Sequence, residues 1–134
     1  MKLLPFILVS FCCLFFIACG NELPTDEQGR EDFEAFYKQY YADSLFQLQR
    51  TEFPLLGQDP TGEQERFYWD IDNWQYLKPV ETDDSAIELL PIIDMDTWMR
   101  ERILIHKTFY MEKQFTLINN KWYLTSYSGI MPLN

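Results

Sequence analysis

Residues 3–17 form the longest apolar run of the chain and stand apart from everything that follows. Leu, Phe, Ile, Val and Cys make up almost all of this run, and Lys2 places one positive charge ahead of it. A bilayer-spanning helix needs about 20 apolar residues, so the run is too short to span a membrane. A short positive start before an apolar run is typical of a secretory signal peptide, which we expect over residues 1–18.

Two helices are predicted after a polar stretch. Four aromatic residues have the i, i+3, i+4, i+7 spacing that lines one face of a helix, namely Phe33, Phe36, Tyr37 and Tyr40. They predict a helix over residues 30–42, with acidic residues in its first turn, where the helix dipole favours them. Ser44 and Gln47 have the spacing of a capping box, which predicts a second short helix over residues 43–49.

The pattern changes to strands beyond residue 58. Phe67, Trp69 and Ile71 alternate with their neighbours, so residues 67–71 are predicted as a strand that continues at 74–77. A polar loop over 78–84 precedes a strand pattern at 86–93, which Pro91 would confine to a sheet edge or a bulge. The longest predicted strand covers residues 102–111.

The clearest strand signal is a hairpin near the C-terminus. Residues 114–118 and 121–125 flank the dipeptide Asn119-Asn120. Asn tolerates a positive φ, so these two residues can form a two-residue hairpin turn. The resulting register puts four large apolar side chains on one face, in the opposing pairs Leu117 with Trp122 and Phe115 with Leu124.

Helices followed by antiparallel strands indicate an α+β fold, with the helices covering one face of a curved antiparallel sheet. The segment before the first helix is polar and contains Pro and Gly, so we expect residues 19–29 to form a flexible tether. No internal repeat or second boundary follows. Residues 30–134 are therefore expected to form a single domain.

The sequence Phe16-Ile17-Ala18-Cys19 ends the apolar run and resembles a bacterial lipobox. A small residue directly precedes a cysteine whose thiol can carry a diacylglyceryl thioether. We therefore expect a lipoprotein of the cell envelope, anchored through Cys19 and acyl chains such as palmitate to a bacterial membrane. The outer membrane is favoured, on its periplasmic or its surface face. The alternatives are an ordinary secretory peptide and an N-terminal membrane anchor that contains Cys19.

Several stretches carry a resemblance to a known family. They are residues 33–41, residues 43–55, Trp74-Gln75-Tyr76-Leu77 and Lys121-Trp122-Tyr123-Leu124, and the Phe-Gln-x-x-Arg-x-x-Phe-Pro-Leu pattern at 46–55 is the most specific. They resemble an uncharacterised family of lipoproteins from Bacteroides-type bacteria, a domain of unknown function. That family is similar in outline to the cone-shaped nuclear transport factor 2-like (NTF2-like, or SnoaL-like) fold. The resemblance implies an envelope location and a cone with a ligand-accepting mouth, and it implies no activity.

Charge and cysteine content narrow the classes of function. The formal net charge is −10 at pH 7, and loss of Lys2 with the signal peptide makes the mature chain one unit more negative. Nucleic-acid binding needs clustered Lys and Arg, so we expect no nucleic-acid partner. Cys12 and Cys13 lie in the expected signal peptide and Cys19 would carry lipid. The domain then has no thiol, which excludes disulfides, thiolate catalysis and cysteine-bound zinc.

The candidates for acid–base chemistry are weak. His106, the only histidine, lies within the predicted strand 102–111 and would need a carboxylate or tyrosine partner in the same cavity to act as a general base. A strand histidine satisfied by its neighbours is the simpler interpretation. Asp94 and Asp96 are two residues apart, as are Asp70 and Asp72, which on a strand points both carboxylates to one face. Such pairs suit calcium or an acid and a base, but without a surrounding Asp, Asn and Gly loop we expect solvated acids, no metal site and no cofactor.

Aromatic residues and one arginine are the candidates for binding. Trp69, Trp74 and Trp98 suit a glycan site, because sugar sites use exposed rings beside carboxylates. Packing explains the same rings, because a small domain with a curved sheet needs large side chains in its core. Arg50 interrupts an apolar approach to Phe53, which predicts an ion pair with an acid of the first helix. A clamp for an anionic ligand is the alternative.

The sequence contains no Gly-rich phosphate loop, no His pair and no convincing nucleophile with its base. We therefore expect a non-enzymatic, lipid-anchored binding or accessory protein whose partner is a small molecule, a glycan or an envelope protein. The alternative is a small hydrolase or isomerase that uses the cone cavity, with His106 or an aspartate as its base.

Overall fold

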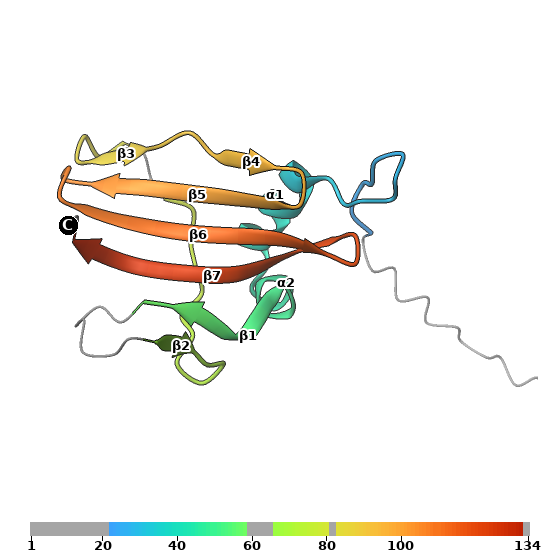
Figure 1. Ribbon diagram of the computed structural model, residues 1–134, viewed down its shortest axis with the longest axis horizontal. Helices are drawn as coiled ribbons and strands as arrows, with labels where there is room; N and C mark the ends of the chain where they lie inside the picture. Colours follow the sequence, from blue (N-terminus) through green and yellow to red (C-terminus); the bar gives the residue numbers. More distant parts are fainter. Residues whose placement is uncertain (1–21, 59–65, 81–82, 133–134) are drawn as a thin grey trace, which may run out of the picture.

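The computed structural model describes residues 22–58, 66–80 and 83–132. The expected signal peptide and Cys19 lie outside the described residues. No helix within these ranges is long and apolar enough to cross a membrane. The helices and strands, shown in Figure 1, are α1 (Phe33–Ala42), α2 (Ser44–Gln49), β1 (Thr51–Gly57), β2 (Phe67–Trp69), β3 (Ile87–Leu89), β4 (Ile93–Met95), β5 (Trp98–Ile105), β6 (Phe109–Ile118) and β7 (Lys121–Pro132).

The strands form one seven-stranded sheet in the order β2-β1-β7-β6-β5-β3, and β4 also pairs with β5. Every neighbouring pair is antiparallel except β1 and β7, which run parallel. The class is therefore α+β as predicted, but the sheet is mixed, and the expectation of an antiparallel sheet was wrong for this pair. β1 and β7 are far apart in the chain, so no local pattern reveals their relative direction.

The first helix begins three residues later than predicted. Asp32 is its N-cap, and the Asp32 carboxylate accepts a 2.8 Å hydrogen bond from the backbone N–H of Ala35. Glu31 stays outside the helix because it forms a β-bridge with Thr25. The chain therefore enters α1 from an extended segment.

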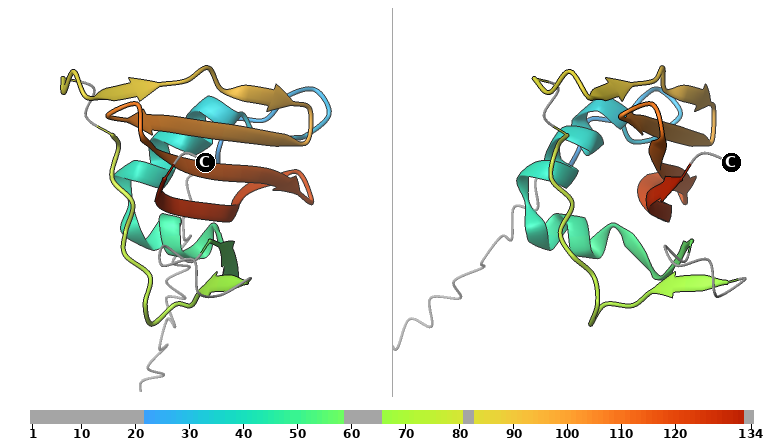
Figure 2. Two further views of the ribbon diagram at one scale, coloured as in Figure 1. Left: turned by 60° about the vertical axis from the view of Figure 1, so that its left-hand side comes forward. Right: turned by 90° about the vertical axis from the view of Figure 1, so that its left-hand side faces the viewer.

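Aromatic contacts connect α1 to the sheet. The rings of Phe36 and Tyr40 are buried, with centroids 5.6 and 5.5 Å from that of Phe115 in β6. Figure 2 shows both helices on the same side of β5, β6 and β7. The buried core cluster consists of Phe36, Tyr40, Leu55, Phe115, Trp122 and Leu124.

The second helix lies where it was predicted, but its cap differs. Asp43 is the N-cap, and its carboxylate accepts from two backbone N–H groups of the first turn. The proposed capping box of Ser44 and Gln47 was wrong, because the Gln47 side chain is buried and bonds elsewhere. It donates to the carbonyls of Tyr40 and Leu77 and accepts from the backbone N–H of Leu77. These bonds fasten the segment 74–80 to the helices.

The predicted strand 102–111 was wrong, because the chain reverses in its middle. β5 ends at Ile105, and β6 begins at Phe109 as its antiparallel partner. His106 and Lys107 form the turn with φ values of 51° and 55°. His106 is therefore an exposed turn residue and not a mid-strand one. Neither residue type marks a turn in a sequence, which is why the pattern looked continuous.

Two other strand predictions changed in detail. The pattern at 86–93 gives the short strands β3 and β4 on either side of Pro91, and both pair with β5 at the sheet edge, as the proline predicted. β2 ends at Trp69, and Asp70 begins a turn. The residues 74–77 that were predicted to continue this strand belong to no strand.

The C-terminal hairpin was predicted correctly. Asn119 and Asn120 form the turn with φ values of 50° and 65°. The pairs Leu117 with Trp122 and Phe115 with Leu124 are those of the structure. The register shifts between Gln114 and Phe115, so the pairing beyond this point is displaced from the predicted one.

The expected tether over residues 19–29 is described only from Glu22 onward. Its Asp26 carboxylate accepts hydrogen bonds from the backbone N–H groups of Gln28 and Arg30 and from the Arg30 side chain. The backbone N–H of Glu31 then donates to the carbonyl of Asn120 at 2.9 Å. Hydrogen-bonded structure therefore begins ahead of residue 30.

Candidate functional site

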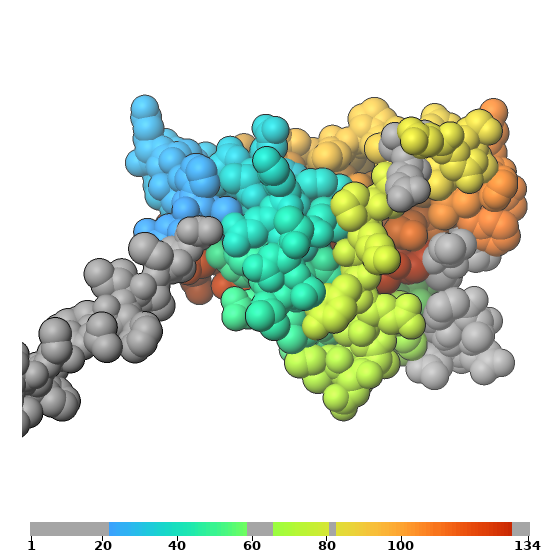
Figure 3. Space-filling model, turned by 180° about the vertical axis from the view of Figure 1, so that it is seen from behind, coloured from blue at the N-terminus to red at the C-terminus, as the bar shows by residue number. Residues whose placement is uncertain are grey.

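A cavity of about 380 Å³ lies between the segment 74–80 and the strands β2, β6 and β7. Figure 3 shows this side of the molecule, with the yellow-green segment crossing beside the helices and the orange and red strands visible beyond it. The bonds from Gln47 hold the segment in place. The residues that line the cavity include Trp69, Trp74, Leu77, Met111, Lys113 and Tyr127, and also the exposed Lys78.

Three aromatic rings form one wall of the cavity. The ring centroid of Trp74 lies 6.2 Å from that of Trp69 and 5.7 Å from that of Tyr127, and both contacts are edge-to-face. The indole N–H of Trp69 donates to the Tyr127 carbonyl at 3.0 Å. The indole nitrogen of Trp74 is buried and has no acceptor among the described residues. The two indoles thus differ in how their N–H groups are used.

A buried ionic cluster lies beside this wall. Lys113 of β6 lines the cavity, is 2% exposed, and is the direct cross-strand neighbour of Glu101 in β5. Its ammonium donates to Glu101 Oε2 at 2.9 Å and to the Tyr41 hydroxyl at 2.6 Å. The Tyr37 hydroxyl donates to Glu101 Oε1 at 2.7 Å. The two tyrosines come from α1, so the cluster joins the helix to the sheet.

Burial shifts the pKa values of three members of this cluster. It lowers the pKa of the Lys113 ammonium, and the neighbouring Glu101 carboxylate partly opposes that shift. Burial, followed by the charge of Glu101, raises the pKa of Tyr37 and that of Tyr41. Both phenols therefore stay neutral near pH 7, and the ion pair of the cluster is that of Lys113 with Glu101.

Lys113 and Glu101 were not predicted as site residues, although the sequence contains a signal for each. Lys113 alternates with Met111 and Phe115 on the inward face of β6, and Glu101 alternates with Ile103 in β5. A charged residue at an apolar position of a period-two pattern indicates a buried, paired charge. Tyr37 was assigned to the helix face correctly, but its partner on a distant strand could not be inferred.

The structure separates the predicted binding residues. Trp69 and Trp74 line the cavity. Trp98 does not line it, and the Arg100 guanidinium lies 5.0 Å from the centroid of the Trp98 ring. His106 is exposed in the β5–β6 turn and is likewise absent from the cavity lining. Only two of these four candidates therefore belong to one site.

The predicted aspartates lie elsewhere. Asp94 and Asp96 border a second, more open hollow near Asp26 and Asp32, where Arg30 is the neighbouring cation. Asp70 and Asp72 lie at a turn rather than on a strand. Within the described residues, no three His, Cys, Asp or Glu side chains form a group able to hold a metal ion.

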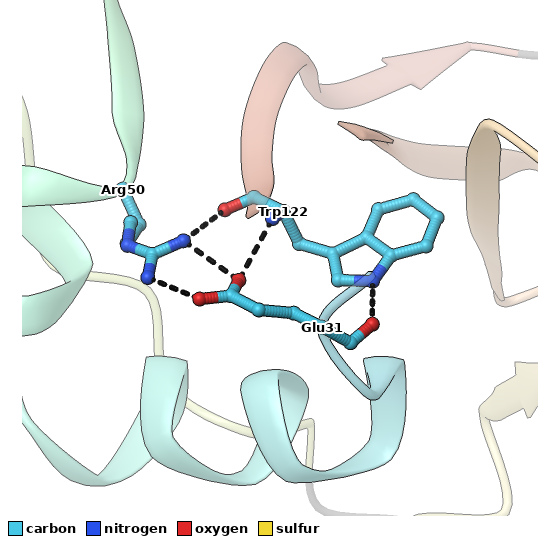
Figure 4. Close-up of polar contacts among 3 residues, drawn as sticks. All are labelled: Glu31, Arg50 and Trp122. Atoms are coloured by element: carbon cyan, nitrogen blue, oxygen red, sulfur yellow. Dashed lines mark hydrogen bonds and ion pairs between the residues drawn. The ribbon is translucent and has the colours of Figure 1, made fainter. Parts of the chain in front are cut away.

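Arg50 forms an ion pair, as predicted, but its partner Glu31 precedes α1 and is not an acid of the first helix, as Figure 4 shows. Its two terminal nitrogens lie 2.8 and 2.6 Å from the Glu31 carboxylate oxygens, and Nη1 also donates to the Trp122 carbonyl at 3.1 Å. Glu31 accepts from the backbone N–H of Trp122, whose indole N–H donates to the Glu31 carbonyl. The guanidinium thus bonds to protein groups and connects the junction of α2 and β1 with β7 and the entry to α1.

Comparison with known proteins finds likeness in structure alone. No protein-family model matches the chain, and no curated protein matches it. A cystatin-like protein from Bacteroides caccae has a TM-score of 0.60 at 17% identity, over 81% of this chain and 80% of that one. A protein from Bacteroides uniformis has a TM-score of 0.53 at 19% identity, over 73% and 76% of the two chains.

An NTF2-like protein from Bacteroides fragilis is also similar, with a TM-score of 0.56 at 21% identity. The match covers 83% of this chain and 50% of that one, so this chain spans half of its length. Identities this low carry information on fold and none on activity. The comparisons therefore show the NTF2-like α+β fold that the sequence resemblance implied.

Proposed function

We propose that the chain is a lipid-anchored protein of the bacterial cell envelope whose domain binds a small molecule in the cavity beside Lys113. In this proposal the helices and the segment 74–80 cover one face of a curved sheet, and the cavity is the mouth of the resulting cone. The ring contacts between α1 and β6 and the register shifts between β6 and β7 support that shape.

The observation that carries the proposal is the arrangement of aromatic rings around a space. A cavity of about 380 Å³ is within the range of about 300 to 1,000 Å³ that is usual for small-molecule sites. Such sites combine apolar walls with a few buried polar groups. Trp69, Trp74 and Tyr127 supply the wall, and Lys113 supplies the polar group.

Blocking the cavity tests the binding function. Met111 lines the cavity, so Met111→Trp should fill it, whereas Met95→Trp places the same ring on an exposed edge strand. We expect native mass spectrometry to find a small molecule that co-purifies with the wild type and with Met95→Trp and is lost in Met111→Trp. Equal occupancy in both variants would place the ligand outside the cavity.

The lipid anchor rests on the sequence around Cys19 and is tested separately. Metabolic labelling with a fatty acid should label the wild type and Cys13→Ser, because the thioether needs only the sulfur of Cys19. Cys19→Ser should carry no label and should leave the membrane fraction or accumulate as precursor. Undiminished label in Cys19→Ser would exclude the lipoprotein assignment.

A small hydrolase or isomerase is the second candidate function, and the buried Lys113–Glu101 pair favours it. Ionisable groups with displaced pKa values beside a cavity are typical of acid–base sites. The base would then come from this pair rather than from His106 or an aspartate, because these do not line the cavity. Turnover of ring-bearing esters or enolisable ketones, lost in a Lys113→Met, Glu101→Gln variant, would support an enzyme.

A further inference from the structure

We propose that the ligand of this cavity is a small, uncharged ring compound with a hydrogen-bond-accepting oxygen that bonds to the Lys113 ammonium. The inference rests on the proposed binding function and adds the chemistry of the ligand. Three features of the cavity carry it: its aromatic wall, the free donor capacity of Lys113 and the charge balance around that residue.

The aromatic wall of the cavity favours a ligand with a flat, apolar ring. Trp74 packs edge-to-face against Trp69 and Tyr127, whose own rings are tilted by 38° to one another, and Met111 of β6 also lines the cavity. Aromatic faces and a polarisable sulfur favour contact with another ring. A volume of about 380 Å³ is close to the lower end of the usual range, so the ligand is small.

Lys113 selects an acceptor on the ligand. An ammonium has three N–H donors, and two of them donate to Glu101 and Tyr41. The third has no acceptor among the described residues, although the side chain is 2% exposed and lines the cavity. A buried donor without a partner is costly, so a ligand oxygen that accepts from it gains affinity.

The charge balance favours an uncharged head group. Glu101 already neutralises Lys113, and the raised pKa values of Tyr37 and Tyr41 keep both phenols neutral. A ligand carboxylate would lose its water and lie near the Glu101 carboxylate. Lys78 also lines the cavity but is exposed, so its ammonium remains in water and compensates that cost only weakly. An amide or ketone oxygen accepts the same hydrogen bond without that penalty.

Three probes that share one ring system separate these contributions. Naphthamide, naphthoate and methylnaphthalene, substituted at the same ring position, present an uncharged acceptor, an anion and no acceptor. We expect calorimetric titration of the wild-type domain to show naphthamide binding at least about tenfold more tightly than either of the others, as a charged donor allows. Equal binding of all three would contradict a hydrogen bond from Lys113 to the ligand. Tighter binding of naphthoate would contradict the preference for an uncharged ligand.

Failure of the underlying binding function gives a different result, because then none of the three probes binds. The role of Lys113 is tested by Lys113→Met combined with Glu101→Gln, which removes both charges and keeps the volumes. The preference for naphthamide over methylnaphthalene should then shrink to less than about twofold. Lys38→Met, on the exposed side of α1, should keep the full preference. An unchanged preference in the double variant would overturn the inference, and the wild-type comparison decides it if that variant fails to fold.

Discussion

The indole nitrogens of Trp69 and Trp74 differ in hydrogen bonding, so the two rings contribute differently to stability. The N–H of Trp69 donates to the Tyr127 carbonyl, so this ring ties β2 to β7. The N–H of Trp74 is buried without an acceptor among the described residues. A buried N–H without a protein acceptor needs an explanation, and the cavity that Trp74 lines offers space for an acceptor.

Replacing each indole by phenylalanine should therefore have unequal effects. Trp69→Phe removes a hydrogen bond and leaves the Tyr127 carbonyl without this donor, whereas Trp74→Phe removes an N–H that bonds to nothing described. Both changes delete a similar volume. We expect the free energy of unfolding to fall by about 1 to 3 kcal/mol more for Trp69→Phe, measured by urea unfolding. A larger loss for Trp74→Phe would contradict the assigned bonds.

Tyr41 makes the free energy of unfolding depend on pH in the alkaline range. Burial and then the charge of Glu101 raise its pKa above 10.0, so the folded protein keeps a proton that the unfolded chain releases. The stabilisation is complete below about pH 10 and is lost as the pH rises further, because the unfolded state then binds fewer protons. Tyr41→Phe removes this titration and should flatten the loss.

Urea unfolding across the alkaline range checks this expectation. Above about pH 10, the free energy of unfolding of the wild type should fall more steeply than that of Tyr41→Phe, by up to about 1.4 kcal/mol per pH unit. Lys113 contributes to the free energy of unfolding with the opposite sign, because its lowered pKa makes stability rise with pH up to 10.5. This contribution is present in the wild type and in Tyr41→Phe. Parallel curves would mean that Tyr41 is not buried beside Glu101.

At the scale of elements, sequence patterns predicted the helices and turns whose formation depends on residues close together in the chain. The aromatic face of α1 and the Asn119-Asn120 hairpin were predicted correctly because helix period and turn chemistry are local. The turn at His106 was not predicted, because His106 and Lys107 have positive φ values that are not typical of these residue types. The parallel pairing of β1 with β7 was missed because it joins segments far apart in sequence.

The same distinction applies to the site. Trp69 and Trp74 were named as candidates from residue type alone, and they do line the cavity. The Lys113–Glu101 pair forms across the β5–β6 hairpin, whose turn was not predicted, so neither register nor partner could be inferred. The ion pair of Arg50 was predicted because a lone charge in an apolar stretch needs a partner.

Gly57 of β1 supports the cavity wall through its lack of a side chain. A Cβ atom there would lie 2.6 Å from Trp69 Nε1 and 2.9 Å from Phe67 Cδ1, so Gly57→Ala must displace the Trp69 ring. Gly129 of β7 is the control, since a Cβ there meets no described heavy atom within 4 Å.

We expect Gly57→Ala to lower the free energy of unfolding by about 1 to 3 kcal/mol, as overpacking does, and to weaken ligand binding. Gly129→Ala should change both by much less. Urea unfolding and a naphthamide titration of the two variants check this. Equal effects would show that the close approach of Trp69 to β1 is incorrect.

At the scale of the whole molecule, an anchor and a cavity would have separate tasks. Both helices lie on one side of the sheet, as Figure 2 shows, and the segment 74–80 lines the cavity. The strongly acidic chain presents a neutral interior pair beside the cavity, since Lys113 and Glu101 balance. In this proposal lipid holds the protein at a membrane while the cavity selects small, uncharged ring compounds.

The four tryptophans allow one direct measurement of where a ligand binds. Trp69 and Trp74 line the cavity, Trp122 is in the core, and Trp98 lies beside Arg100 away from the cavity. In a ¹H–¹⁵N correlation spectrum of the domain, naphthamide should shift the indole signals of Trp69 and Trp74 and leave those of Trp98 and Trp122 in place. A shift confined to Trp98, or no shift at saturating naphthamide, would contradict a binding site in this cavity.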